Sequence, residues 1–349
     1  MDWITQPCPQ RKPEFKTNAL ERQTQLTKPL GSLGLLETLA IQIADLQQTD
    51  QPNVDEVAIA IFAADHGVAE EGVSAFPQEV TAQMVMNFLQ GGAAISVLAR
   101  QLKAKLEIID TGILTPFTKQ EGLIIQRAGA GTNNSANQAA MTLEQLKKAL
   151  QAGHDAITRA IKNKAQLFIG GEMGIANTTS ASVLYCALLK LDAENITGAG
   201  TGLDDAGIQH KINVVKHILH KHQACGEDTL AWLRCAGGFE IIALTGAYIK
   251  AAQSGLPILV DGFISSVAAL CAVRLNKGVN DYLIFSHVSA EQGHRKVLET
   301  LNKSALIDLN MRLGEGSGAA VTVNLLQSAC HLHNQMATFA EAAVATKSA

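Results

Sequence analysis

Short, largely apolar runs recur along the middle of this chain, and polar residues do not alternate through them. They lie at residues 57–64, 105–109, 165–169, 256–260 and 281–285. Runs of this kind are typical of strands buried on both faces, as in parallel sheets. We therefore expect a strand at each of these five positions.

Helical patterns lie before, between and after the predicted strands. One apolar face recurs at spacings of three and four residues, at Leu35, Leu39, Ile43 and Leu46. A second helix is predicted from Pro77 through Phe88, and a third opens at Thr142, where Gln145 completes a capping-box pattern. Residues 319–338 are predicted to form the last helix.

Strands that alternate with helices favour an α/β fold with a parallel sheet and helices on its faces. We expect a large α/β domain over residues 50–315 and a small helical domain built from residues 1–49 plus 316–349. Polar residues follow the predicted strands, as at Asp65-His66 and Asp261-Gly262. Ligands bind at the carboxyl ends of such strands, although loops are polar in any case.

Composition narrows the functional classes. The net charge is −4 and the basic residues form no stripe, so nucleic acid is not an expected partner. The start lacks the apolar stretch of a signal peptide, and the apolar runs are far shorter than a membrane helix, so no membrane partner is expected. The six cysteines form no C-x-x-C pair, which favours reduced thiols and a cytoplasmic location.

Several common catalytic signatures are absent from the sequence, including the phosphate-loop, zinc-protease and nucleophile-elbow motifs. The glycines at 198–202 and 129–131 do not follow a predicted strand in the dinucleotide-binding register. His217, His220 and His222 lie beside Lys216 and Lys221, which favours a solvated helix face over a metal site. No metal is expected.

Two glycine-rich segments are candidates for binding an anion. Residues 170–182 follow a strand and lead into a helix, whose first N–H groups could approach a phosphate, with Glu172 close by. Residues 197–211 combine Gly200, Thr201 and Gly202 with Lys211. The alternatives are a capped turn with a surface Glu, and a flexible loop with a surface Lys.

Two further segments place a carboxylate beside glycine. Asp261 ends a predicted buried strand and could bind a ribose hydroxyl, orient the loop backbone, or serve structure alone. Glu315 lies between Gly314 and Gly316, so a ligand could approach its carboxylate closely. Apolar neighbours such as Leu313 would raise the pKa of Glu315 toward that of a useful general base, although a Glu near a helix start is also a normal capping residue.

At these segments the chain resembles the nicotinate-nucleotide–dimethylbenzimidazole phosphoribosyltransferases of cobalamin lower-ligand synthesis. The resemblance covers nearly the whole chain and rests on seven segments in order. They are KPLGSLGLLE (28–37), AADHGV (63–68), GEMGIANTT (171–179), GGFE (237–240), LPILVDGF (256–263), SHVSAEQG (286–293) and RLGEGSGAA (312–320).

The resemblance implies a Rossmann-like parallel sheet with a small helical domain, assembled as a homodimer. The implied reaction joins nicotinate mononucleotide and 5,6-dimethylbenzimidazole to give α-ribazole 5′-phosphate and nicotinate. The nicotinate ring leaves as a neutral pyridine nitrogen and the incoming base loses an N–H proton. The reaction therefore calls for one carboxylate base and for neither a metal nor a cofactor.

The resemblance also implies roles for individual residues. Glu315 matches the family's general base, and Glu172 matches a second carboxylate that would support the ribosyl cation. The phosphate contacts correspond to Gly174, Ile175, Gly200, Thr201, Gly202 and Lys211, and the ribose and leaving-group contacts to Asp261 and Ser289.

Residues 74–84 match the stretch where the family binds its aromatic base. Phe76, Met84 and Leu313 could enclose a flat ring. Their identity leaves open whether the acceptor is dimethylbenzimidazole, benzimidazole, adenine or a phenol. Two other classes stay open on the residues alone. A nicotinamide-dependent oxidoreductase would bind NAD(H), and a non-catalytic nucleotide-binding protein would tolerate the loss of Glu315.

Overall fold

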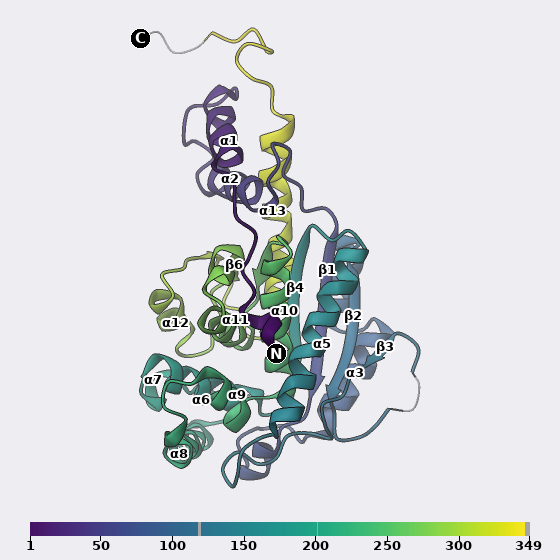
Figure 1. Cartoon of the computed structure of the whole chain (residues 1–349), viewed down its shortest axis with the longest axis vertical. Coiled ribbons are helices and arrows are strands. Elements are labelled where there is room, and N and C mark those ends of the chain that lie inside the picture. Colours follow the sequence, from purple (N-terminus) through teal and green to yellow (C-terminus); the bar gives the residue numbers. More distant parts are fainter. Residues whose placement is uncertain (118–119, 201, 346–349) are drawn as a thin grey trace.

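All strand pairs in the central sheet are parallel. The structure, a computed structural model, describes residues 1–117, 120–200 and 202–345. Within that part the sheet has seven strands in the order β3-β2-β1-β4-β5-β6-β7 (Figure 1). The strands are β1 (Val57–Ala64), β2 (Lys105–Gly112), β3 (Leu123–Ile125), β4 (Leu167–Met173), β5 (Ile258–Val260), β6 (Leu283–His287) and β7 (Ala305–Ile307).

Helices cover both faces of the sheet. Along the chain they are α1 (Pro13–Gln25), α2 (Leu35–Gln47), α3 (Glu79–Gln90), α4 (Ala94–Leu102), α5 (Leu143–Lys162), α6 (Asn177–Leu189), α7 (Ala193–Ile196), α8 (Asp205–Lys221), α9 (Thr229–Ala236), α10 (Phe239–Gln253), α11 (Phe263–Leu275), α12 (His294–Thr300) and α13 (Ser317–Gln335). Short 3₁₀ helices lie at Asp2–Thr5, Gly67–Glu71, Gln223–Cys225 and Lys277–Tyr282.

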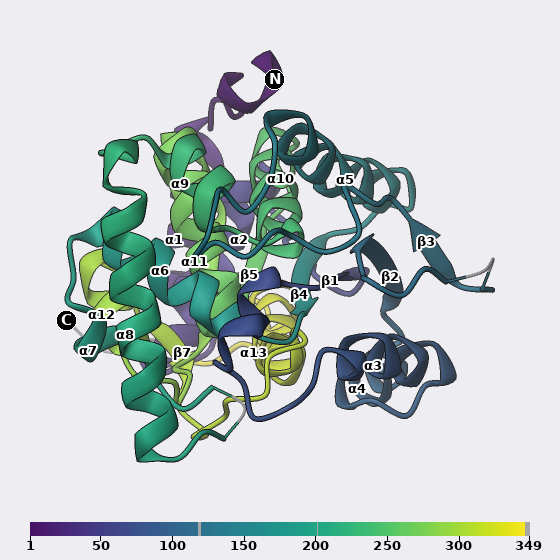
Figure 2. The same ribbon diagram turned by 90° about the horizontal axis from the view of Figure 1, so that it is seen from below.

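The two faces of the sheet form two separate hydrophobic cores. Along β1, Ala60 and Phe62 point into the core shared with α5 and α10, whereas Ile59 and Ile61 point into the core shared with α2, α4 and α13. Successive side chains of a strand point to opposite faces, so a strand covered on both sides must be apolar throughout. Figure 2 shows α5 and α10 on one side of the sheet and α3, α4 and α13 on the other.

Strand order locates the expected ligand site. The chain builds outward from β1 through β2 to β3, then returns to the other side of β1 with β4 and continues to β7. This is the doubly wound arrangement, in which ligands are expected at the carboxyl ends of the strands near the point where the direction reverses, here between β1 and β4. The Rossmann-like parallel sheet expected from the sequence is confirmed.

The predicted helices are present with small differences in their bounds. At the start of α5 the capping box is complete, because the Gln145 N–H donates to Thr142 Oγ1 at 3.2 Å and the Thr142 N–H donates to Gln145 Oε1 at 2.9 Å. The sequence patterns placed no individual helix at α1, α4, α7, α9, α10, α11 or α12, and they did not predict the edge strands β3 and β7.

Helices near the two ends of the chain, α1, α2 and α13, lie together (Figure 1). Helix α1 packs against α2, and α2 packs against α13. A bridge pairs Leu26 with Thr338, so the N- and C-terminal segments lie side by side (Figure 1). Helix α13 also packs against β4 and β6. It therefore belongs to both groups of elements, and the domain boundary at residues 315–316 stays a prediction.

The stretch Glu79–Leu102 is long and apolar enough to cross a membrane by length and composition alone. It forms two helices, α3 with 12 residues and α4 with nine, separated by a turn at Gly91 with φ +80°. A membrane-spanning helix needs about 20 residues in one run. Neither helix reaches that length.

Candidate active site

A hollow of about 310 Å³ opens at the carboxyl ends of β4, β5 and β6. Its walls come from segments far apart in the sequence, and most of them are glycine-rich. They include Phe76, Glu172–Ile175, Asn177, Thr178, Gly200, Asp261–Ser265, His287, Ser289, Glu291 and Arg312–Glu315. Two carboxylates, Glu172 and Glu315, therefore share one enclosed space, as the sequence reading proposed.

The turn that carries Glu315 has an unusual backbone. Gly314, Glu315 and Gly316 all have positive φ, at +83°, +63° and +80°. A non-glycine residue in this region is strained by about 1–2 kcal/mol, and such strain persists where surrounding contacts fix it. The turn is pressed against β4, because a Cβ on Gly314 would lie 2.6 Å from Glu172 Oε1. The flanking glycines are thus required by both conformation and space.

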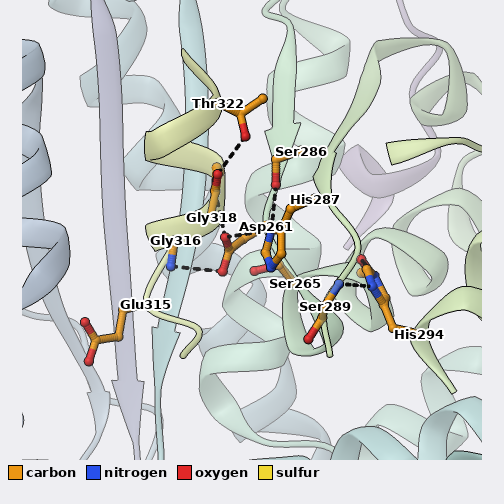
Figure 3. Close-up of polar contacts among 12 residues, drawn as sticks. Asp261, Ser265, Ser286, His287, Ser289, His294, Glu315, Gly316, Gly318 and Thr322 are labelled. Atoms are coloured by element: carbon orange, nitrogen blue, oxygen red, sulfur yellow. Dashed lines mark hydrogen bonds and ion pairs between the residues drawn. The ribbon is translucent and has the colours of Figure 1, made fainter. Parts of the chain in front are cut away.

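Asp261, which follows β5, anchors this turn through two hydrogen bonds. Its Oδ2 accepts from the Gly316 N–H at 3.2 Å and its Oδ1 accepts from the Ala319 N–H at 2.8 Å (Figure 3). These N–H groups belong to the start of α13, so Asp261 caps that helix from the end of β5. The Glu315 side chain points away from Asp261 (Figure 3). Of the roles that the sequence left open for Asp261, the geometry favours orienting the backbone.

Glu315 is suited to proton transfer near neutral pH. Its side chain is buried, and burial raises its pKa to about 7, with a smaller contribution from the charge of Asp261. Its Oε2 has no hydrogen-bond partner within the described residues. A carboxyl group with a pKa near the working pH and one unpaired oxygen, on a residue that lines a hollow, is a candidate to accept a proton from a bound molecule.

Glu172 lies on β4, and its pKa is raised further than that of Glu315. Burial raises its pKa to about 8, and the charges of Glu240 and Asp261 act in the same direction. Asn177 Nδ2 donates to Oε2 of Glu172, and the backbone N–H of Glu315 lies 3.4 Å from Oε1. At neutral pH the carboxyl group of Glu172 is therefore mostly protonated in the free protein.

The part of the hollow lined by Thr178 and Gly200 has the features of an anion site. Lys211, on α8, is 1% exposed, and its Nζ donates to Thr178 Oγ1 at 2.7 Å and to the Gly198 carbonyl oxygen at 3.4 Å. Burial lowers the pKa of Lys211 to about 8. A Cβ on Gly200 would lie 3.0 Å from Nζ, so the loop backbone closes directly on the ammonium group. The first turn of α6, with Asn177 and Thr178, faces the same part.

Most of the site residues named from the sequence come together in this hollow. The residues that line it are Phe76, Glu172, Gly174, Ile175, Gly200, Asp261, Ser289, Leu313 and Glu315, and Lys211 lies behind Thr178 and Gly200. Gly202 is not in the lining, and Thr201 lies outside the described residues.

Met84 does not reach the hollow either. It is half-buried on α3 and packs against the core that includes Val85 and Phe88. The side chains that α3 buries are Thr81, Val85 and Phe88, so the face it turns to the core differs by one residue from the predicted one. Of the three side chains named for the base pocket, Phe76 and Leu313 remain in the lining.

Sequence reasoning overlooked several residues of the lining. Asn177 and Thr178 lie in a motif that had been singled out, and their position at a helix start was a usable signal. Arg312 precedes the Gly-Glu-Gly turn, and His287 and Glu291 flank Ser289. These three also lie in segments that carry the family resemblance, 286–293 and 312–320, but no role was assigned to them from the sequence. In the described part of the chain, no three His, Cys, Asp or Glu residues are grouped so as to hold a metal ion.

Comparisons with known proteins agree with this geometry. The chain matches the model of a family described as phosphoribosyltransferase over residues 8–344. It is 55% identical to the nicotinate-nucleotide–dimethylbenzimidazole phosphoribosyltransferase of Pseudomonas putida W619, covering 99% of this chain and 98% of that protein. The protein of the same name from Pseudomonas fluorescens Pf-5 is also 55% identical, with 99% of each chain covered.

Solved structures give the same result. The crystal structure of the nicotinate-nucleotide–dimethylbenzimidazole phosphoribosyltransferase from Thermus thermophilus superposes with a TM-score of 0.91 at 40% identity, over 96% of this chain and 100% of that one. A structure of CobT from the same organism gives 0.92 at 41% identity, with the same coverage. The chain therefore belongs to the phosphoribosyltransferase family that contains the nicotinate-nucleotide–dimethylbenzimidazole enzymes.

Proposed function

We propose that this transferase moves the 5-phosphoribosyl group of nicotinate mononucleotide to 5,6-dimethylbenzimidazole, or to a related base, in cobalamin biosynthesis. The products are α-ribazole 5′-phosphate and nicotinate. The observation that carries the proposal is Glu315, which lines the hollow and whose buried carboxyl group has an oxygen without a hydrogen-bond partner among the described residues and a pKa of about 7. It is supported by the relatives' names and by the buried ammonium group of Lys211 behind Thr178 and Gly200.

The bonds define what the residues must do. The glycosidic bond between the ribose and the pyridinium nitrogen breaks, and its electron pair stays with nicotinate, which leaves as a neutral ring nitrogen. The imine nitrogen of the benzimidazole forms the new bond to the same ribose carbon, and its N–H nitrogen then loses a proton. Glu315 accepts that proton. General-base assistance of this kind contributes about 10²–10⁴-fold to a rate.

The proposed role of Glu172 is to stabilise positive charge on the ribose, and not to transfer a proton. Bond breaking leaves positive charge on the ribose, and a carboxylate next to it lowers the energy of that state. In the free protein the pKa of Glu172 is about 8, so the group is mostly neutral. The pyridinium ring of the substrate is cationic, and its arrival favours the ionised carboxylate. Binding of the substrate would thereby favour the ionised form of Glu172, which is the form that stabilises the ribosyl cation.

The residues proposed to bind the 5′-phosphate of the mononucleotide are Lys211, Gly200 and the segment Gly174–Thr178. A phosphate placed among them would receive backbone N–H groups from a helix start and the charge of a buried ammonium group. The flat base would lie between Phe76 and Leu313, which are both about half exposed at the mouth of the hollow. These two side chains offer apolar contact and leave the choice of base open.

The proposal is tested by identifying the product. Purified protein is incubated with nicotinate mononucleotide and each of dimethylbenzimidazole, benzimidazole, adenine and phenol, and the ribotides are characterised by mass spectrometry and NMR. The account expects an N-linked ribotide with dimethylbenzimidazole. An exclusively O-linked product would change the acceptor class, and the absence of any ribotide from folded protein would refute the transfer itself.

The assembly is a separate part of the proposal. We propose a cytoplasmic location, which six cysteines outside any disulfide favour, and a homodimer, which the family resemblance implies. Light scattering after gel filtration should give twice the chain mass of 37.0 kDa. A mass of a single chain at micromolar concentration would contradict the dimer.

A further inference from the structure

A fully buried histidine lies directly behind the wall of the hollow. His66 follows β1, and both it and its partner Glu240 are 0% exposed. His66 Nε2 lies 2.7 Å from Oε1 of Glu240, in the first turn of α10. His66 Nδ1 lies 3.0 Å from Oγ of Ser180, in the first turn of α6. One imidazole ring therefore joins the end of β1 to the starts of two helices.

The same ring packs against the backbone of the hollow. A Cβ added to Gly174, which lines the hollow, would lie 3.2 Å from the His66 ring and 2.5 Å from the Ala64 carbonyl oxygen. A Cβ on Gly238, just before α10, would lie 2.2 Å from Cε1 of His66. At Gly238 the ring itself leaves no room for a side chain, and at Gly174 the ring and the Ala64 carbonyl oxygen together leave none. The ring supports the wall at Gly174.

The wall that it supports is a turn in a strained conformation. Ala176 has φ +74°, a left-handed value that is uncommon for a residue with a side chain. The turn is closed by the Asn177 N–H, which donates to the Gly174 carbonyl oxygen at 3.1 Å, and it is anchored by the Ile175 N–H, which donates to Thr81 Oγ1 at 3.1 Å. Such a conformation persists where the surroundings fix it from several sides. His66 provides one of these sides, through Gly174 and Ser180.

We propose that His66 and Glu240 are positioning residues, which hold the Gly174–Asn177 turn and the start of α6 in the geometry that receives the 5′-phosphate of the mononucleotide. The inference rests on the proposed function for the identity of that ligand. Neither side chain belongs to the lining of the hollow, so each acts through the backbone and Ser180 rather than by touching the substrate.

The pair also has an electrostatic effect on the site. The charge of Glu240 is the second largest cause, after burial, of the raised pKa of Glu172.

The hydrogen bond between His66 and Ser180 and the charge of Glu240 can be removed separately. Ser180→Ala deletes one hydroxyl group and leaves the His66–Glu240 contact in place, and Glu240→Gln keeps an oxygen that accepts from His66 but removes the charge.

The test measures the two ligands separately in Ser180→Ala. Calorimetric titration should show the Kd for nicotinate mononucleotide rising about tenfold, since the loss of one buried hydrogen bond is of this order, with the Kd for dimethylbenzimidazole changing less than about twofold. Thr245→Val is the matched control. It removes another buried hydroxyl group, which donates to the Ile241 carbonyl oxygen within α10, away from the hollow. It should leave both values within about twofold.

Two further variants separate positioning from folding. His66→Asn keeps a nitrogen close to the Nδ1 position, toward Ser180, and should bind the mononucleotide more tightly than His66→Ala. Glu240→Gln should bind it within about threefold of wild type, because the acceptor is retained. Should His66→Ala fail to fold, Ser180→Ala still decides the matter. An unchanged mononucleotide Kd in folded Ser180→Ala, or equal losses for both ligands, would overturn the proposal.

The outcome is independent of whether the proposed reaction is correct. Inorganic phosphate is titrated alongside the mononucleotide, and Ser180→Ala should weaken its binding by a similar factor. Wild-type protein that binds phosphate but produces no ribotide would refute the proposed function and leave the positioning claim to be judged on phosphate. Normal turnover with unchanged phosphate and mononucleotide binding in Ser180→Ala would refute the positioning claim alone.

Discussion

The backbone N–H of Glu315 points at the carboxylate of Glu172, 3.4 Å from Oε1. Glu172 and Glu315 are therefore linked through the side chain of the first and the main chain of the second, and the Oε2 of Glu315 has no partner among the described residues. The environments of the two groups place their pKa values at about 7 and about 8. Two carboxyl groups with distinct environments suit two distinct roles in one reaction.

The first prediction concerns the pH dependence of turnover. Glu315 must be unprotonated to accept a proton, so kcat/KM should fall on the acid side with a limb centred near pH 7. An ordinary Glu would place that limb near pH 4–5. The residual activity of Glu315→Gln should lack this limb. A wild-type profile that is flat from pH 5 to 8 would show that another group takes the proton.

Binding of the mononucleotide should release a proton. Glu172 is mostly protonated at pH 7, and the cationic pyridinium ring favours its ionised form, so the proton leaves as the substrate enters. Calorimetric titrations at pH 7 in two buffers with different ionisation enthalpies measure the number of protons released. Glu172→Gln should abolish most of this release. Equal release in wild type and variant would assign the proton to another group.

The same carboxyl group should make stability depend on pH in a defined direction. In the folded protein the pKa of Glu172 is about 8, well above the usual value of 4.5. Between these two values the folded state holds more protons than the unfolded state, so this group lowers the free energy of unfolding as pH rises. Glu172→Gln removes that dependence. Its Tm relative to wild type should be higher at pH 8.5 than at pH 5, by about 2 °C or more.

Replacing Lys211 should weaken binding of one substrate while raising stability. Burial lowers the pKa of Lys211 to about 8, which means that the folded state disfavours its charge. Lys211→Met removes that charge and keeps the apolar stem. The Kd for the mononucleotide should rise about 10–100-fold and that for the base about twofold at most, with no fall in Tm at pH 7. Equal losses for the two ligands would contradict a phosphate contact.

Lys216→Met is the control for that variant. Lys216 lies on the same helix, α8, but is half exposed and pairs with Glu194 on the surface. Surface ion pairs contribute little to stability, so this substitution should change neither Kd by more than about twofold and should leave Tm nearly unchanged.

The sequence predicted the parts of the fold that depend on local pattern. The run VAIAIFAA coincides with β1, because a strand covered on both faces must be apolar throughout. The edge strands β3 and β7 have three residues each, none of them fully buried, so unlike β5 they are not part of a longer apolar run buried on both faces. Helix α1 buries only Ala19 and Gln23, so it shows almost no apolar face.

The site could be predicted only in part, for a similar reason. Glu172 and Glu315 carried local signals, a glycine turn in each case. Their approach to within one hydrogen bond depends on α13 returning to the sheet beside β4, which no local pattern shows. The rotation of α3 that removes Met84 from the hollow is set by packing against the core, and this too is a tertiary effect.

The role of Glu315 as general base is tested by comparing wild type and Glu315→Gln in one assay. Base-dependent release of nicotinate is followed at pH 7.5 with saturating nicotinate mononucleotide and dimethylbenzimidazole, and the Kd for the mononucleotide is measured on the same preparations. The account predicts release that requires the base, a loss in kcat of at least about 100-fold in the variant, and Kd values within about twofold. A variant with near-normal kcat, or wild-type protein that releases no nicotinate when the base is added, would contradict it.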